Sequence, residues 1–277
     1  MTALNVCKLF DLLNFLEEIM AEWTTAVTSI KPNEILIRGY AIEDIMENLS
    51  YAETVYLILK GELPTKEEGR VFQAVLVSSV DHGVTPPSAL ATLNATSTGA
   101  PLNAAVASGL LAINAFHGGA IENTMKMLKA AAEYCGNTLD EAKVEEFVKM
   151  KFEQKFRFPG MGHRVHTEDP RSVKLAEICF KNLPEEKLFF IKLAKMIEAN
   201  IFKVKGTKLP VNVDGMIGAV LLALEIPAEL ANGIFMISRV PGLMAHYVEE
   251  KTTQKPMRNI DQKAAIYNGH EKRKIGE

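Results

Sequence analysis

Cysteine, net charge and long hydrophobic runs are all scarce in this sequence. Its three cysteines, Cys7, Cys135 and Cys179, lie far apart without the close spacing of a metal site, so we expect free thiols in a reducing cytoplasm. The formal charge is only −3, with acids and bases interspersed, which is not typical of a protein that binds nucleic acid or an anionic membrane. The sequence contains no uninterrupted run of about 18 apolar residues, so no membrane-spanning helix is predicted.

The N-terminus also lacks the basic start and the small-residue cleavage site of a secretory signal. Acidic residues interrupt its apolar stretch, and the apolar residues recur at three- and four-residue spacing. We therefore predict an amphipathic helix over residues 1–25 and a cytoplasmic protein. The apolar face of this helix would carry Leu9, Leu12, Leu13, Leu16 and Met20.

Helical periodicity dominates the rest of the chain, which predicts an all-α fold with one short extended segment at 34–39. One helix is expected to end at Gly61, with Pro64 just beyond, and the next to run from 66 into Gly83. The stretch 87–120 is rich in Ala, Ser, Thr and Gly, which favours closely packed interior helices over a ligand channel. Further helices are predicted at about 119–134, 138–155, 170–181, 186–201, 212–224 and 227–250. Residues 259–277 form a polar, basic tail.

Three of the six histidines stand at breaks beside glycine: His82, His117 and His163. A histidine in such a loop can point into a cleft, and glycine lets backbone and ligand approach closely. Each of the three, taken singly, is more often structural. His163 and His166 lie three residues apart, but that spacing is too common to predict a metal site.

One aspartate and two arginines are further candidates for a functional site. Asp214 stands among small and apolar residues, where it either caps a helix or has a raised pKa suited to proton transfer. Arg171 and Arg239 suit bidentate binding of a carboxylate, and equally an ion pair. The chain has no GxxxxGK[ST] loop for ATP, and GMGHRV lacks the third glycine of a dinucleotide-binding loop.

Six stretches in this order resemble the citrate synthase superfamily, and together they run from about residue 30 to about residue 258. The branch that the chain resembles most is citryl-CoA lyase, a relative of which forms the C-terminal module of ATP citrate lyase. The short chain, VNVDGMIG and GLMAHYVEEK favour that branch, while FHGG and ISRVPG also resemble synthase signatures. The stretches are ILIRGYAIEDIMENLSYAETVYLILKGELPTKEE, DHG, FHGGAIENTMKML, GMGHRVHTEDPR, VNVDGMIGAVLLAL and NGIFMISRVPGLMAHYVEE.

The resemblance implies a role for each matching residue. His117 would hold the enol oxygen of acetyl-CoA, His163 would serve the oxygen of the four-carbon partner, and Asp214 would move the proton at the acetyl carbon. His82, Arg171 and Arg239 would bind oxaloacetate. Lys255 stands where the family has an arginine supplied by the second subunit, and Arg258 is a candidate replacement. His166, Arg164, Glu168 and Asp169 receive no role and are expected in a solvated or ion-paired loop.

The resemblance also implies a single catalytic unit over residues 1–277, with a large and a small helical region whose boundary cannot be read. We expect cleavage of citryl-CoA to acetyl-CoA and oxaloacetate without ATP, by a homodimer or larger homo-oligomer. The CoA thioester would be a substrate, with no permanently bound cofactor or metal, and a separate synthetase would form citryl-CoA. The alternatives are a citrate or 2-methylcitrate synthase, and an inactive scaffold of the family.

Overall fold

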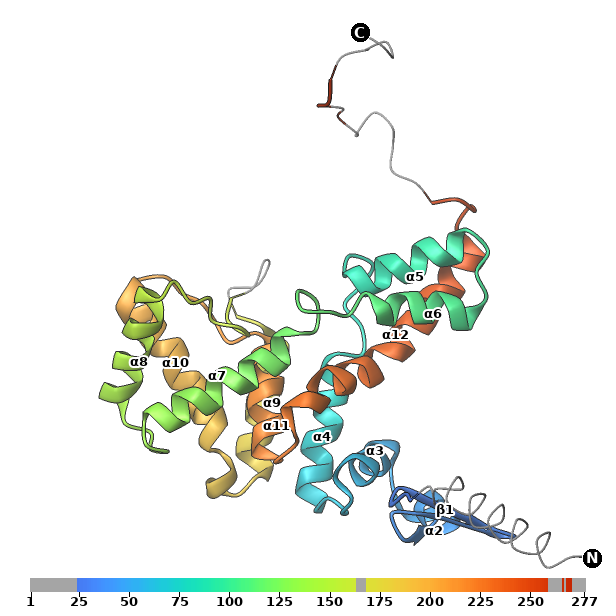
Figure 1. Ribbon diagram of the computed structural model, residues 1–277, viewed down its shortest axis with the longest axis horizontal. Coiled ribbons are helices and arrows are strands. Elements are labelled where there is room, and N and C mark those ends of the chain that lie inside the picture. Colours follow the sequence, from blue (N-terminus) through green and yellow to red (C-terminus); the bar gives the residue numbers. More distant parts are fainter. Residues whose placement is uncertain (1–23, 163–167, 259–265, 267, 271–277) are drawn as a thin grey trace, which may run out of the picture. The chain divides into compact units, whose positions relative to one another are not determined.

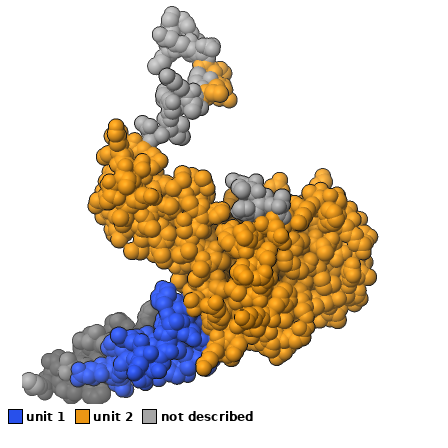
Figure 2. All heavy atoms as spheres, turned by 180° about the vertical axis from the view of Figure 1, so that it is seen from behind, with its two compact units in different colours: residues 1–64 blue, residues 65–277 orange. Residues whose placement is uncertain are grey.

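The computed structural model describes residues 24–162, 168–258, 266 and 268–270. It divides into two compact units, Met1–Pro64 and Thr65–Glu277 (Figure 2). Nearly all of the predicted N-terminal helix, and most of the tail 259–277, lie outside the described residues.

The described part of the first unit, residues 24–64, combines a small sheet with two helices. Strands β1 (Thr28–Lys31), β2 (Glu34–Ile37) and β3 (Tyr40–Ala41) form an antiparallel sheet in that order, followed by α2 (Ile42–Asn48) and α3 (Tyr51–Lys60). The extended segment predicted at 34–39 is confirmed as β2, whereas β1 and β3 were not predicted. A capping box between Ser50 and Glu53 begins α3, which ends as predicted at Gly61, where φ is 88°.

In the described residues of the second unit, the regular secondary structure is helical (Figure 1). The predicted helices are confirmed to within a few residues, with one exception. The helix expected to reach Gly83 ends at Ser78, because Asp81 accepts a hydrogen bond from the Gly83 amide and the chain turns there instead. The helices are α4 (Lys66–Ser78), α5 (Pro87–Ser97), α6 (Leu102–Leu111), α7 (Ala120–Tyr134), α8 (Glu141–Glu153), α9 (Pro170–Asn182), α10 (Phe189–Lys205), α11 (Val213–Ala223) and α12 (Ala231–Thr253), with 3-10 turns at Glu185–Lys187 and Ala228–Leu230.

Small residues bring α5 and α6 close together beside the later part of α12 (Figure 1). A Cβ on Gly109 of α6 would lie 2.2 Å from Thr92 Oγ1 and 2.8 Å from the Ser88 carbonyl oxygen of α5. The prediction of close packing in this stretch is confirmed. In the described residues, no helix is long and apolar enough to cross a bilayer.

Helix α11 forms the centre of the other helical cluster, since it packs against α7, α9 and α10. Its residues from Gly215 to Ala223 are all buried, so the helix is apolar on every side. A Cβ on Gly218 would lie 3.1 Å from the backbone oxygen of Ile121 and from Thr124 of α7. The N-terminus of this central helix is where the candidate site begins. The predicted large and small helical regions stay a prediction.

Candidate active site

A cleft of about 470 Å³ lies in the second unit and gathers residues from distant parts of the sequence. It includes His82, His117, Arg171, Asp214 and Arg239, all of which the sequence singled out. His163 lies outside the described residues, although Gly162 beside it lines the cleft. The lining residues are His82, Thr85, Pro86, Pro87, Phe116, His117, Gly118, Gly162, Arg171, Asn212, Val213, Asp214, Phe235 and Arg239.

His117 stands in a tight loop before α7. Reciprocal backbone hydrogen bonds of 2.8 and 2.9 Å between Asn114 and His117 close the loop. Gly118 has a φ of 82°, and a Cβ there would lie 2.7 Å from Ile113 Cγ2, so glycine is required. The His117 Nε2 lies 2.8 Å from Ser88 Oγ, and the ring meets Phe235 edge-on at 5.8 Å. Burial, and secondarily Arg239, lowers the His117 pKa, so the imidazole is neutral at pH 7.

Asp214 is the second residue of α11, and it does not cap that helix. The N-cap is Asn212, whose side chain accepts the Gly215 amide at 3.0 Å. The capping interpretation of Asp214 is therefore wrong. Within the described part of the chain, its carboxyl group has no hydrogen-bond partner. Burial raises its pKa, which Arg171 and Arg239 partly offset, and this is the environment expected of a proton-transfer group.

The glycines of GMG hold the segment before His163 against the start of α11. A Cβ on Gly160 would lie 2.4 Å from the Gly215 Cα, and one on Gly215 would lie 2.2 Å from the Gly160 oxygen. The Asn212 amide donates to the Gly160 oxygen at 3.0 Å, and Asn212 Nδ2 donates to the Gly162 oxygen at 2.8 Å. This crossing requires glycine on both sides and places the chain entering His163 beside Asp214.

Arg171 reaches the cleft from the first turn of α9 and is paired with Asp169. Its Nε and Nη2 donate to Asp169 Oδ1 and Oδ2 at 3.0 and 2.9 Å. The Asp169 side chain is fully buried, so of the solvated or ion-paired loop expected there the ion-paired alternative is confirmed at Asp169. Arg164 and His166, which shared this expectation, lie outside the described residues. Asp169 also caps α9 ahead of Pro170, and an aspartate before proline at a helix start was a signal available in the sequence.

Arg239 lies inside α12 and is only 3% exposed. Its Nε donates to the Ser79 oxygen at 2.8 Å, and its guanidinium lies 4.8 Å from the centre of the Phe235 ring. Its Nη1 is buried and has no hydrogen-bond partner among the described residues. Burial lowers the Arg239 pKa, while Asp81 and Asp214 raise it. A buried cation with an unused donor at a cleft wall is suited to bind an anion.

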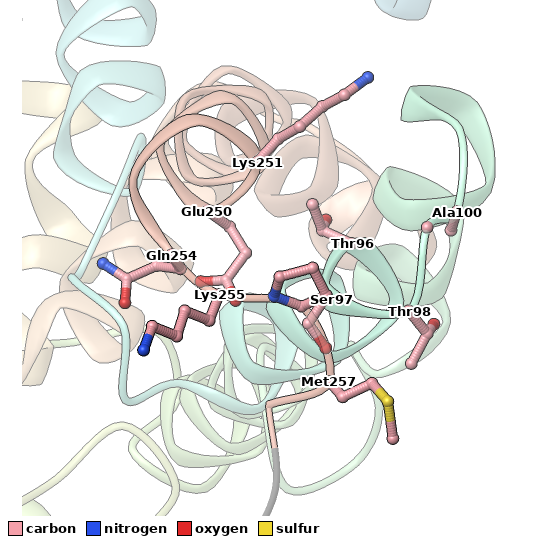
Figure 3. A pocket seen from close by; sticks show the side chains of 11 residues that line it. Thr96, Ser97, Thr98, Ala100, Glu250, Lys251, Gln254, Lys255 and Met257 are labelled. Carbon is pink, nitrogen blue, oxygen red and sulfur yellow. The ribbon is translucent and has the colours of Figure 1, made fainter.

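Lys255 and Arg258 do not line this cleft. Lys255 borders a separate pocket of about 310 Å³ between the end of α12 and the residues that follow α5 (Figure 3). Arg258 forms two hydrogen bonds, of 3.0 and 2.6 Å, with the buried carboxylate of Glu250. Their expected contribution to the site of a second subunit stays a prediction.

His82 is exposed at the rim of the cleft. The carboxylate of its neighbour Asp81 accepts a hydrogen bond from His246 Nε2 of α12 at 2.9 Å. The described residues contain no group of three or more His, Cys, Asp or Glu side chains that could hold a metal ion. The cleft brings together histidines, a carboxyl group of raised pKa and two arginines.

The chain belongs to the citrate synthase family, because the model of that family's C-terminal domain matches residues 17–78 and 66–260. This confirms the superfamily indicated by the sequence motifs.

The proteins that this chain is similar to include both lyases and citrate synthases. The citryl-CoA lyase of Hydrogenobacter thermophilus is 40% identical, with a TM-score of 0.82, and the match covers 92% of this chain and 97% of that one. The ATP citrate lyase of Methanothrix soehngenii shares the fold, with a TM-score of 0.80 at 23% identity, over 91% of this chain and 42% of that one. Citrate synthase 2 of Bacillus subtilis is 31% identical over 237 residues, which are 83% of this chain and 59% of that relative. The chain thus spans a little over half the length of that curated relative.

Proposed function

We propose that this protein is a citryl-CoA lyase, which cleaves citryl-CoA to acetyl-CoA and oxaloacetate without ATP. The observation that carries the proposal is the likeness to the Hydrogenobacter thermophilus citryl-CoA lyase over nearly the whole length of both chains. The cleft supports it, since it contains matches to the family's catalytic residues His117 and Asp214 together with Arg171 and Arg239.

Substrate carboxylates would bind to the arginines. The unused Nη1 of Arg239 and the remaining Nη1 of Arg171 both belong to side chains that line the cleft. Fixed cations hold the carbon skeleton in the orientation that cleavage needs. His82, exposed at the rim, would add a hydrogen bond to the oxaloacetate part.

Cleavage would follow a retro-aldol course. His163 takes the proton of the substrate hydroxyl, the carbonyl of oxaloacetate forms, and the electron pair of the breaking carbon–carbon bond moves into the thioester. Neutral His117 donates a hydrogen bond to the resulting enolate oxygen. Asp214, with its raised pKa, delivers a proton to the terminal carbon and completes acetyl-CoA. Solvent returns a proton to Asp214 and removes one from His163 before the next turnover.

A citrate or 2-methylcitrate synthase is the second candidate, because the curated relative at 31% identity is a citrate synthase. The same residues would then condense an acyl-CoA with oxaloacetate, and water would hydrolyse the thioester. In either case the CoA thioester is a substrate rather than a resident cofactor. A lyase without an ATP-binding loop requires a separate synthetase to form citryl-CoA, and we place the reaction in the cytoplasm, in a homodimer or larger homo-oligomer.

Two parallel assays on the purified protein separate the candidates. With citryl-CoA and no ATP, we expect oxaloacetate to accumulate, measured by malate dehydrogenase and NADH oxidation. With acetyl-CoA and oxaloacetate, we expect little free CoA in a thiol-reagent assay, because a lyase leaves the thioester intact. Rapid CoA release with equal citrate formation would establish the synthase instead. Inactivity in both assays would leave the inactive scaffold.

A further inference from the structure

Asp169 has four hydrogen bonds and no exposed side-chain surface. Its Oδ1 accepts from the Arg171 amide and from Arg171 Nε, both at 3.0 Å. Its Oδ2 accepts from Arg171 Nη2 at 2.9 Å and from the Val213 amide at 3.0 Å. A buried carboxylate whose two oxygens both accept hydrogen bonds holds its donors rigidly in place, and so forms a connection between Arg171 and Val213.

The two ends of this connection are functional parts of the cleft. Arg171 lines the cleft from α9, and Val213 is the first residue of α11, immediately before Asp214. Val213 follows Asp169 by 44 residues, so this one carboxylate joins segments that are distant in sequence. Asp169 itself is not among the residues that line the cleft.

We propose that Asp169 is a positioning residue, which fixes the Arg171 guanidinium relative to the N-terminus of α11 and so sets the distance between bound substrate and Asp214. This inference rests on the proposed function, in which Arg171 binds a substrate carboxylate and Asp214 transfers a proton. Displacement of either group removes the advantage of proximity, for which an error of about 1 Å costs on the order of 100-fold in rate.

Charge provides a second effect that distinguishes positioning from capping. The charged groups that act on Asp214 are Arg171 and Arg239, which lower its pKa, and Asp169, which raises it. His82 and His117 line the same cleft, and His117 is neutral at pH 7. Removal of the Asp169 charge therefore lowers the Asp214 pKa, both directly and by releasing Arg171 from its carboxylate partner.

Asp169→Asn tests the proposal with little change of shape. Asparagine caps a helix as well as aspartate does, so α9 keeps its N-cap. The amide nitrogen of asparagine replaces one carboxylate oxygen. If it replaces Oδ2, the hydrogen bonds from Arg171 Nη2 and the Val213 amide are lost, because a donor then faces both donors. Asp169→Ser is the second variant, since serine also caps a helix but cannot pair with Arg171. Asp140→Asn is the matched control, because Asp140 caps α8 through the amides of Ala142 and Lys143 and is exposed.

The affinity for oxaloacetate is measured first, by calorimetry with freshly prepared ligand. We expect wild-type protein and Asp140→Asn to bind it equally, and both Asp169 variants to bind at least about tenfold more weakly. The kcat of citryl-CoA cleavage is then measured against pH. As the acid, Asp214 must be protonated, so kcat falls as pH rises through its pKa, and this alkaline limb moves to lower pH in Asp169→Asn.

The possible results separate the positioning role of Asp169 from the proposed function. Weaker binding together with a displaced pH limb, in variants whose circular dichroism matches wild type, supports the positioning role. Variants that lose thermal stability but retain oxaloacetate affinity and the wild-type pH profile show a cap alone and overturn it. Wild-type protein that binds no oxaloacetate overturns the proposed function and this inference with it.

Discussion

The two arginines that line the cleft differ in how many of their guanidinium donors already have a hydrogen-bond partner. Arg171 uses Nε and Nη2 on Asp169, whereas the buried Arg239 has an Nη1 with no hydrogen-bond partner in the described chain. An unsatisfied buried donor costs about 1–3 kcal/mol, which binding of an anion would recover. In the proposed function, Arg239 would therefore be the stronger anchor for a substrate carboxylate, and Arg171 the more rigid one.

Arg239→Lys should weaken oxaloacetate binding far more than CoA binding. Lysine keeps the charge but loses the planar pair of donors, and it also loses the bond from Nε to the Ser79 oxygen. Calorimetry with each ligand measures the difference, with Arg70→Lys, at an exposed position of α4, as the control. Equal oxaloacetate binding by both variants and wild type would remove Arg239 from the site.

Asp214→Asn should keep the fold and lose nearly all turnover. The amide has a similar shape but cannot deliver the proton, and loss of a general acid or base commonly costs about 100- to 10,000-fold. Since Asn212 caps α11, thermal stability should change little. Initial rates of citryl-CoA cleavage, with circular dichroism as the check on folding, test this. A folded variant with near-normal kcat would show that the carboxyl group has no catalytic part.

At the scale of elements, apolar periodicity and stop signals predicted nearly all the helices, because most of them bury one apolar face, whereas α11 is buried on every side. The sequence did not predict β1, β3 or the burial of Asp169. Those features depend on partners elsewhere in the chain, as when Asp169 accepts the amide of Val213. The site residues were identified through family motifs, whereas the contact between Gly160 and Gly215 exists only in the folded chain.

Gly215→Ala should disrupt the start of α11. Its new Cβ would lie 2.2 Å from the backbone oxygen of Gly160, and that backbone cannot rotate away as a side chain could. Such overpacking costs about 1–3 kcal/mol in the free energy of unfolding. We expect a lower Tm and a loss of kcat as the segment entering His163 moves.

Gly233→Ala is the control for this change. Gly233 lies in α12, and a Cβ there meets nothing within 4 Å. Alanine in a helix interior is favoured over glycine by up to about 1 kcal/mol, so this variant should be as stable as wild type or more so. Equal Tm values for the two alanine variants would contradict the proposed close contact at Gly215.

At the scale of the whole molecule, we predict that a second copy of the chain completes each site. Lys255 and Arg258 resemble the segment that the family supplies across subunits, and neither lines the cleft of its own chain. If each site is completed in this way, two defective chains can complement each other. One chain needs only an intact cleft, and the other only an intact segment.

A mixture of Asp214→Asn with the double variant Lys255→Ala, Arg258→Ala should therefore regain activity. After subunit exchange, half of the dimers are mixed and each has one complete site, so roughly a quarter of wild-type activity is expected. Each variant alone should have little. Light scattering confirms the oligomer, and a mixture no more active than its parts would place these residues outside the site.

The most direct test of the central claim is cleavage of citryl-CoA in D2O, with mass spectrometry of the products at low conversion. If Asp214 delivers a solvent-derived proton to the enolate carbon, the acetyl-CoA carries one deuterium in its methyl group, and oxaloacetate forms in equal amount. Asp214→Asn should form little of either product. Conversion of citryl-CoA to citrate and free CoA, without labelled acetyl-CoA, would contradict the lyase assignment.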